Sequence, residues 1–200
     1  MNNSDETQRY KERQQKRKEK IDKVVSTANK ERGLLLVITG NGKGKSTSGF
    51  GTVARAVGHG QQAAVVQFIK GNWDCGERNL LQSHGVEFAV MNTGFTWDTQ
   101  DREADIQAAQ KVWQDAKRML ADPKLDLVLL DELTYMLSYK YLNIDEVLQA
   151  IADRPAEMSV IVTGRAAHRR LCDMADTVSD IQSVKHALKA GLRARKGVDW

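Results

Sequence analysis

A loop rich in glycine and lysine is the part of the sequence best suited to carry chemistry. Its residues are Gly40, Asn41, Gly42, Lys43, Gly44, Lys45, Ser46 and Thr47. Backbone N–H groups in such a loop converge on an anion, and Gly42 and Gly44 are expected to adopt the positive φ angles that this needs. Lys45 adds a mobile cation for phosphate oxygens, and Ser46 adds a hydroxyl for a bound Mg²⁺ (or Mn²⁺). We therefore expect this loop to bind the triphosphate of a nucleotide, ATP.

The loop departs from the usual phosphate-loop pattern, GxxxxGK[ST], at one position. Thr39 stands where the first glycine of the pattern belongs. The context supports the assignment, because a buried strand is predicted before the loop and a helix after it. The alternative is a glycine-rich turn in which the lysines are incidental.

A pair of carboxylates, Asp131 and Glu132, ends another apolar segment. A carboxylate at the end of a buried strand can reach a phosphate-bound metal, so we expect at least one of the two to bind it. The alternative for Asp131 is that it only caps the next helix. Arg165 follows a further apolar segment and is a candidate for contacting phosphate, although a surface arginine fits equally well.

Strands and helices alternate along the chain. The pattern predicts strands over residues 34–39, 63–69, 86–91, 125–130, 160–163 and 177–184, and helices over 46–59, 101–121 and 144–152. Most of the strands are apolar throughout, which predicts a mostly parallel sheet with helices on both faces. We assign the chain to the α/β class with a RecA-like P-loop fold. In such sheets ligands bind beyond the carboxyl ends of the strands, where all the candidates above fall.

The first 31 residues form a polar, basic segment that is predicted to be helical from residue 5. We divide the chain into this arm, residues 1–31, and a single nucleotide-binding domain, residues 32–200. The run Lys16-Arg17-Lys18 could mark a nucleic-acid arm, but Glu12, Glu19 and Asp22 interrupt it and favour a solvated helix. With so thin an apolar face, the helix is either loosely ordered or docked on something else.

The totals describe an ordinary globular protein with a net charge of +4, 41% hydrophobic and 28% charged residues. No apolar run approaches the roughly 20 residues that span a bilayer, and the polar N-terminus is unlike a secretory signal. Cys75 and Cys172 lack the spacing of a disulfide framework or a zinc site. We expect a cytoplasmic protein without a membrane partner.

Several further segments occur together with the phosphate loop. They read RAVGHG at 55–60, VQFIKG at 66–71, GERN at 76–79, TGFTW at 93–97, DELTY at 131–135 and TGR at 163–165. With GNGKGKST at 40–47, they make the chain resemble the P-loop type of corrinoid adenosyltransferase, the ATP:cob(I)alamin adenosyltransferases. The likeness runs from about residue 10 to the C-terminus.

This resemblance implies transfer of the 5′-deoxyadenosyl group of ATP to the Co(I) of cobalamin or a precursor corrinoid, with release of triphosphate. The product belongs to adenosylcobalamin biosynthesis or salvage. Reduced cobalt is itself the nucleophile, which suits a sequence without an evident general base. The resemblance also implies that Phe95 and Trp97 displace the lower axial ligand of the corrinoid and so ease its reduction. Without the resemblance, the preferred interpretation would be that Phe95 and Trp97 are aromatic side chains packed in the core.

The same resemblance implies a homodimer in which the N-terminal helix covers the partner's active site, and a flavodoxin-like reductant. A different class of function remains as the alternative: a P-loop ATPase switch or a nucleic-acid motor that uses the basic N-terminal arm. We regard a nucleic-acid partner as the weaker interpretation, because only Tyr10 is available for stacking in that arm.

Overall fold

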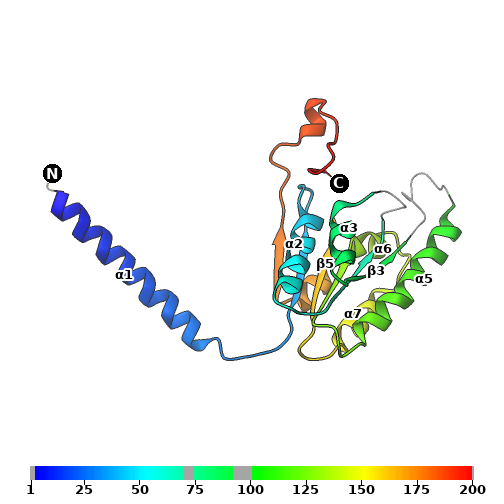
Figure 1. Ribbon diagram of the computed structural model, residues 1–200, viewed down its shortest axis with the longest axis horizontal. Helices are drawn as coiled ribbons and strands as arrows, with labels where there is room; N and C mark the ends of the chain where they lie inside the picture. The colour runs from blue at the N-terminus through cyan, green and yellow to red at the C-terminus, as the bar shows by residue number, and fades with distance from the viewer. Residues whose placement is uncertain (1–2, 70–73, 92–100, 200) are drawn as a thin grey trace. The chain divides into compact units, whose positions relative to one another are not determined.

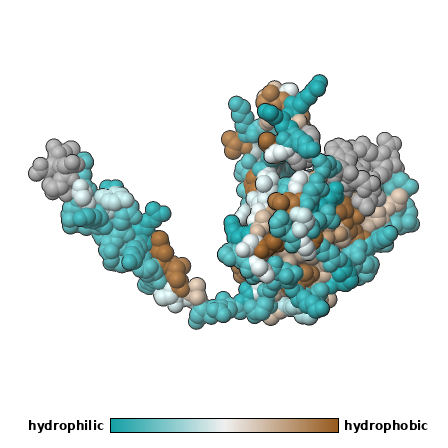
Figure 2. All heavy atoms as spheres, in the orientation of Figure 1, coloured by the Kyte–Doolittle hydropathy of each residue, from teal (hydrophilic) through white to brown (hydrophobic). Residues whose placement is uncertain are grey.

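The computed structural model describes residues 3–69, 74–91 and 101–199 (Figure 1). Contacts divide the chain into two units, Met1–Glu31 and Arg32–Trp200. The first unit contains one helix, α1 (Asn3–Thr27), which ends four residues before the predicted boundary. Its apolar side chains gather near its end, where Ile21, Val24 and Val25 are exposed on adjacent turns (Figure 2).

The second unit is built on one six-stranded sheet of order β3-β2-β4-β5-β1-β6, and every neighbouring pair is parallel. The strands are β1 (Leu35–Thr39), β2 (Ala63–Gln67), β3 (Glu87–Val90), β4 (Leu127–Asp131), β5 (Ser159–Thr163) and β6 (Thr177–Asp180). All residues of β2 and β4 are buried, as their continuous apolar runs predict, whereas the polar β6 is exposed along an edge. The predicted parallel sheet is confirmed.

Helices cover both faces of this sheet. They are α2 (Lys45–Gly58), α3 (Gly76–Ser83), α5 (Arg102–Leu120), α6 (Leu133–Ser138), α7 (Ile144–Ala152) and α8 (Arg169–Met174), with a 3-10 turn at Ala187–Ala190. The two faces have separate cores, and β4 contributes to both, with Val128 and Leu130 in one and Leu127 and Leu129 in the other. This alternation follows from the two-residue period of a strand. The RecA-like α/β expectation is therefore confirmed.

The two cores differ in their helices. Trp113, Met119 and Met136 belong to the larger core, which α5, α6, α7 and α8 cover. Phe50 and Leu81 belong to the smaller core, under α2 and α3. The phosphate loop joins the carboxyl end of β1 to the first residues of α2, and α2 packs on β4, β5 and β1. Since β5 lies next to β1 and β4 lies next to β5, the carboxyl ends of these parallel strands lie at the same edge of the sheet as the loop.

Three short helices, α3, α6 and α8, were not predicted. They contain 8, 6 and 6 residues, which is too short for a helical period to stand out in the sequence. In the part of the chain that the structure describes, no helix is both long and apolar enough to cross a membrane.

Candidate nucleotide site

The phosphate loop joins β1 to α2, and its backbone depends on two glycines. Gly40 has φ 102° and Gly44 has φ 117°, in the region that side chains disfavour. The expected positive φ at Gly42 is wrong, since Gly42 is not among the residues with this conformation. Gly42 is needed for a different reason: a Cβ there would lie 2.6 Å from the carbonyl oxygen of Gln182. The loop is therefore packed against the chain that follows β6.

Lys45 is the first residue of α2 and is almost fully buried, with 7% of its surface exposed. Its Nζ donates to the carbonyl oxygen of Gly42 at 2.8 Å, which folds the side chain back over the loop. Burial lowers the pKa of Lys45, while the nearby carboxylates of Glu132 and Asp131 oppose this shift. A cation that has lost hydration in this way is well placed to exchange the carbonyl for phosphate oxygens.

The two carboxylates at the end of β4 have different surroundings. Asp131 is completely buried and accepts hydrogen bonds from Thr163 Oγ1 at 2.7 Å and from Gln67 Nε2 at 3.4 Å. Glu132 has φ 62°, and its backbone N–H donates to the same Thr163 hydroxyl at 2.9 Å. This left-handed backbone turns Glu132 away from the direction of the strand. Glu132 lines the phosphate-loop pocket and Asp131 does not.

Arg165 follows β5 through another glycine. Gly164 has φ 135°, and a Cβ on it would lie 2.1 Å from Thr134 Oγ1. The Thr134 hydroxyl donates to the carbonyl oxygen of Arg165 at 2.7 Å, so α6 fixes the backbone of this residue. Arg165 thereby lies at the pocket with Glu132, as the predicted arrangement of strand ends requires.

One pocket of about 240 Å³ brings these residues together. From the loop it is lined by Asn41, Gly42, Lys43, Gly44, Lys45, Ser46 and Thr47, and from the strand ends by Glu132 and Arg165. Gly40 shapes the loop without lining the pocket, and Asp131 lies behind it. Phe95 and Trp97 lie outside the described residues.

The pocket also includes three residues without a predicted role: Glu77, His186 and Asp199. Glu77 belongs to α3, a helix too short for a helical period to stand out in the sequence, and His186 lies in the chain that follows β6. Asp199 is far from the loop in the sequence and reaches it only through the fold. Their roles depend on distant contacts, which no local pattern could reveal.

The residues present suit a hard divalent cation bound mainly through phosphate. Within residues 3–69, 74–91 and 101–199, no cluster of three or more His, Cys, Asp or Glu side chains could hold a metal alone. The Ser46 hydroxyl and the Glu132 carboxylate nevertheless line the same pocket as the loop. Mg²⁺ commonly takes one or two such oxygen ligands and completes its shell with phosphate and water. The donor set therefore fits Mg²⁺.

Comparison with known proteins gives the family. The model of the ATP:corrinoid adenosyltransferase family (BtuR/CobO/CobP) matches residues 31–200, and a model for the N-terminal part of cob(I)alamin adenosyltransferases matches residues 1–25. The chain is 60% identical to the corrinoid adenosyltransferase of Escherichia coli K12 over 193 residues, covering 96% of this chain and 98% of that protein. The corrinoid adenosyltransferase CobA of Salmonella typhimurium is also 60% identical over 193 residues, with the same coverage. The corrinoid adenosyltransferase of Pseudomonas aeruginosa is 49% identical over the full length of both chains. The chain belongs to the ATP:corrinoid adenosyltransferase family.

Proposed function

We propose that the pocket at the phosphate loop holds the triphosphate of ATP while the 5′-deoxyadenosyl group passes to the reduced cobalt of a corrinoid. The chain is a corrinoid adenosyltransferase by its family, and these matches do not favour an ATPase switch or a nucleic-acid motor. The observation that carries the site is the single pocket in which the glycine-rich loop meets Glu132 and Arg165. This pocket brings hydrogen-bond donors for phosphate together with a carboxylate that can bind a metal, at the carboxyl edge of the sheet.

The proposed reaction needs stabilisation of a leaving group rather than a general base. An electron pair of Co(I) forms the cobalt–carbon bond to C5′, the C5′–O bond breaks, and its electrons leave with the triphosphate. Negative charge on the phosphates therefore rises as the bond breaks. The loop N–H groups and the buried Lys45 are in place before this happens, and such preorganised donors stabilise the transition state more than the ground state; the exposed Arg165 at the edge of the pocket can add a further positive charge.

Ser46 and Glu132 are the residues that we propose to hold the Mg²⁺ (or Mn²⁺) of the nucleotide. Such an ion, when bound, neutralises charge on the leaving phosphates. We assign Asp131 an indirect role: through Thr163 it fixes the backbone N–H of Glu132, to which the same hydroxyl is bonded. This separates the roles of two carboxylates that the sequence could not distinguish.

The products provide the test of the proposed function. Attack at C5′ should release all three phosphates together, so phosphorus NMR of a completed reaction with ATP and chemically reduced corrinoid should show inorganic triphosphate. Omitting the corrinoid is the control and should leave ATP intact. ADP and orthophosphate as the main products would instead identify an ATPase.

We also propose that Phe95 and Trp97 ease reduction of Co(II) by excluding the lower axial ligand. Replacing either with histidine should leave ATP binding nearly unchanged and strongly slow the reaction that starts from Co(II). The defect should be much smaller with prepared Co(I), because the assisted step has been bypassed. Electron paramagnetic resonance of bound Co(II) measures the four-coordinate form directly, and an unchanged amount in folded variants would leave the aromatics as core anchors.

The exposed apolar side chains of α1, Ile21, Val24 and Val25, support a further proposal. They would be covered in a homodimer in which this helix closes the partner's site. A monomeric mass by sedimentation equilibrium in the presence of both substrates would exclude the dimer. For the electron donor we propose a flavodoxin-like protein, which should support turnover from Co(II) without a chemical reductant.

A further inference from the structure

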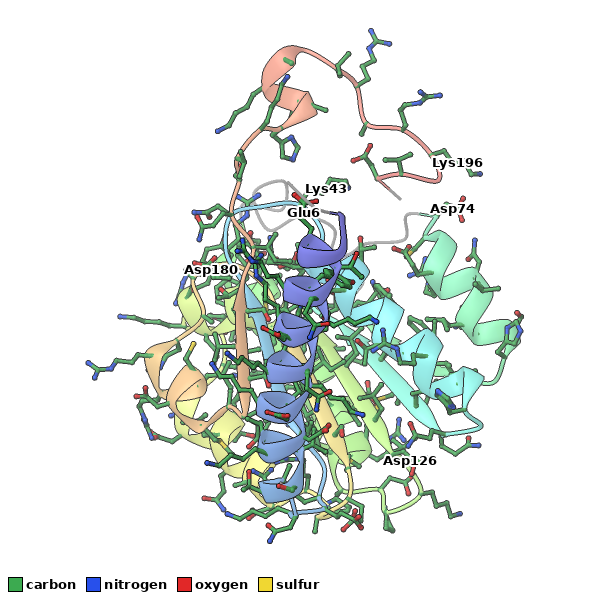
Figure 3. The ribbon with its side chains drawn as sticks, turned by 90° about the vertical axis from the view of Figure 1, so that its left-hand side faces the viewer. Glu6, Lys43, Asp74, Asp126, Asp180 and Lys196 are labelled. Atoms are coloured by element: carbon green, nitrogen blue, oxygen red, sulfur yellow. The ribbon has the colours of Figure 1, made fainter. Side chains whose placement is uncertain are left out.

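The chain beyond β6 is attached to the phosphate loop at several points. We call residues 181–199 the C-terminal strap. At its start, the carbonyl oxygen of Ile181 accepts from Gly42 N at 2.7 Å. Near its end, Asp199 Oδ1 lies 2.8 Å from Lys43 Nζ, and Lys196 Nζ lies 3.3 Å from Asp74 Oδ2 (Figure 3). The strap therefore leaves the loop, returns to it and reaches the segment before α3.

His186 brings an imidazole from the strap to the pocket of the phosphate loop. It lines that pocket and also the adjoining cavity of about 250 Å³, which is formed largely by the strap itself. Its Nδ1 accepts a hydrogen bond from Leu188 N at 3.2 Å, where it caps the 3-10 turn. A neutral ring with Nδ1 as acceptor must carry its proton on Nε2. No hydrogen bond from Nε2 occurs among the residues described, so this donor is available to a ligand.

Asp199 places a carboxylate in the same pocket. It is ion-paired with Lys43, and the pKa of Asp199 is lowered mainly by the hydrogen bond from Lys43 and further by that from Arg195 N. A bound triphosphate would bring several negative charges to the residues that Asp199 now contacts. Like charges within a few ångströms repel, so carboxylate and phosphate compete for the same lysine.

We propose that the C-terminal strap is part of the nucleotide site: His186 donates from Nε2 to the triphosphate, and the triphosphate replaces Asp199 as the partner of Lys43. The inference rests on the proposed function, because it assumes that ATP places its phosphates in this pocket. It gives two residues of the C-terminal strap opposite effects on the affinity for ATP. His186 strengthens ATP binding, and Asp199 weakens it.

Two substitutions separate the capping and donor roles of His186. His186→Asn keeps an acceptor for Leu188 N but lacks the distal donor, whereas His186→Gln keeps a donor near the position of Nε2. Calorimetric titration with MgATP, without corrinoid, should show about tenfold weaker binding for His186→Asn, since a hydrogen bond to a charged group is lost. His186→Gln should bind nearly as well as the parent. His84→Asn, at an exposed histidine after α3, is the matched control. Parent-like binding by folded His186→Asn would overturn this half of the inference.

Asp199→Asn tests the competition. Removal of its charge should tighten MgATP binding by roughly two- to fivefold, the range expected for an exposed ion pair. Asp173→Asn is the control: it removes a more exposed carboxylate, paired with Arg169 on α8, and should leave binding unchanged. Unchanged or weaker binding by Asp199→Asn would contradict the proposal.

The parent protein and Lys45→Ala distinguish failure of the strap from failure of the site. If the parent does not bind MgATP, or binds it equally well without Lys45, then the proposed nucleotide site itself is wrong. If Lys45→Ala binds MgATP more weakly than the parent, while the strap variants match the parent, only the inference about the strap is wrong.

Discussion

Lys45→Ala should reduce the rate of adenosyl transfer by roughly 10²–10³-fold while the protein stays folded. Lys45 is the buried cation of the loop, it lines the pocket, and its Nζ lies 2.8 Å from the Gly42 carbonyl oxygen. Lys45 should contact the triphosphate before the reaction as well as during it, so ATP affinity should fall, and kcat should fall further because the charge on the triphosphate rises as the C5′–O bond breaks. Single-turnover measurements with saturating ATP and prepared Co(I) would isolate this step.

Lys43→Ala is the matched control for this variant. Lys43 belongs to the same loop, but its side chain is 42% exposed and already shares its charge with Asp199. We expect a much smaller loss of rate, because an exposed charge is screened by solvent. Circular dichroism and a thermal melt would verify that both variants are folded. Near-normal turnover by folded Lys45→Ala would remove the phosphate loop from the mechanism.

Glu132→Gln should be the second most damaging change, with a loss of about 10²–10³-fold in rate. The substitution preserves size and leaves the backbone N–H that bonds to Thr163, but it removes the negative oxygen that we assign to the metal. The direct readout is Mn²⁺ binding in the presence of ATP, followed by electron paramagnetic resonance. Glu132→Gln should weaken it sharply.

Asp131→Asn provides the contrast. Its side chain lies behind the pocket, so it should act through the position of Glu132 and reduce metal affinity by about 10–100-fold, as is typical of residues behind a metal ligand. If Asp131→Asn abolished Mn²⁺ binding while Glu132→Gln retained it, Asp131 would be the metal ligand instead of Glu132. That result would reverse the assignment.

The sheet was predictable because its strands carry their own signal. The four apolar residues that begin β4 predict a strand buried on both faces, and the structure places them in the two cores. The helix α2 was also predictable, because its apolar residues recur at helical spacing directly after the loop. The short α3 and α6 carry no such signal, because a helix of one or two turns is stabilised by the surface on which it packs.

The site was predictable to the extent that its residues lie in one loop or at the ends of strands. The role of Gly42 was not, since it depends on the close approach of Gln182, 140 residues further along the chain. His186 and Asp199 illustrate the same limit. Each reaches the pocket through a segment whose path is fixed by contacts with the loop, and the local sequence around them has no recognisable phosphate-binding pattern.

The backbone of Glu132 has a consequence for engineering this protein toward heat resistance. A left-handed conformation at a residue other than glycine costs on the order of 1–3 kcal/mol, so glycine at this position would relieve strain that the native chain retains. Selection for thermal stability alone would therefore favour Glu132→Gly, which removes the carboxylate that we assign to the metal. The melting temperature of such variants would rise as their catalysis was lost, and position 132 should be kept fixed in any library screened for stability alone.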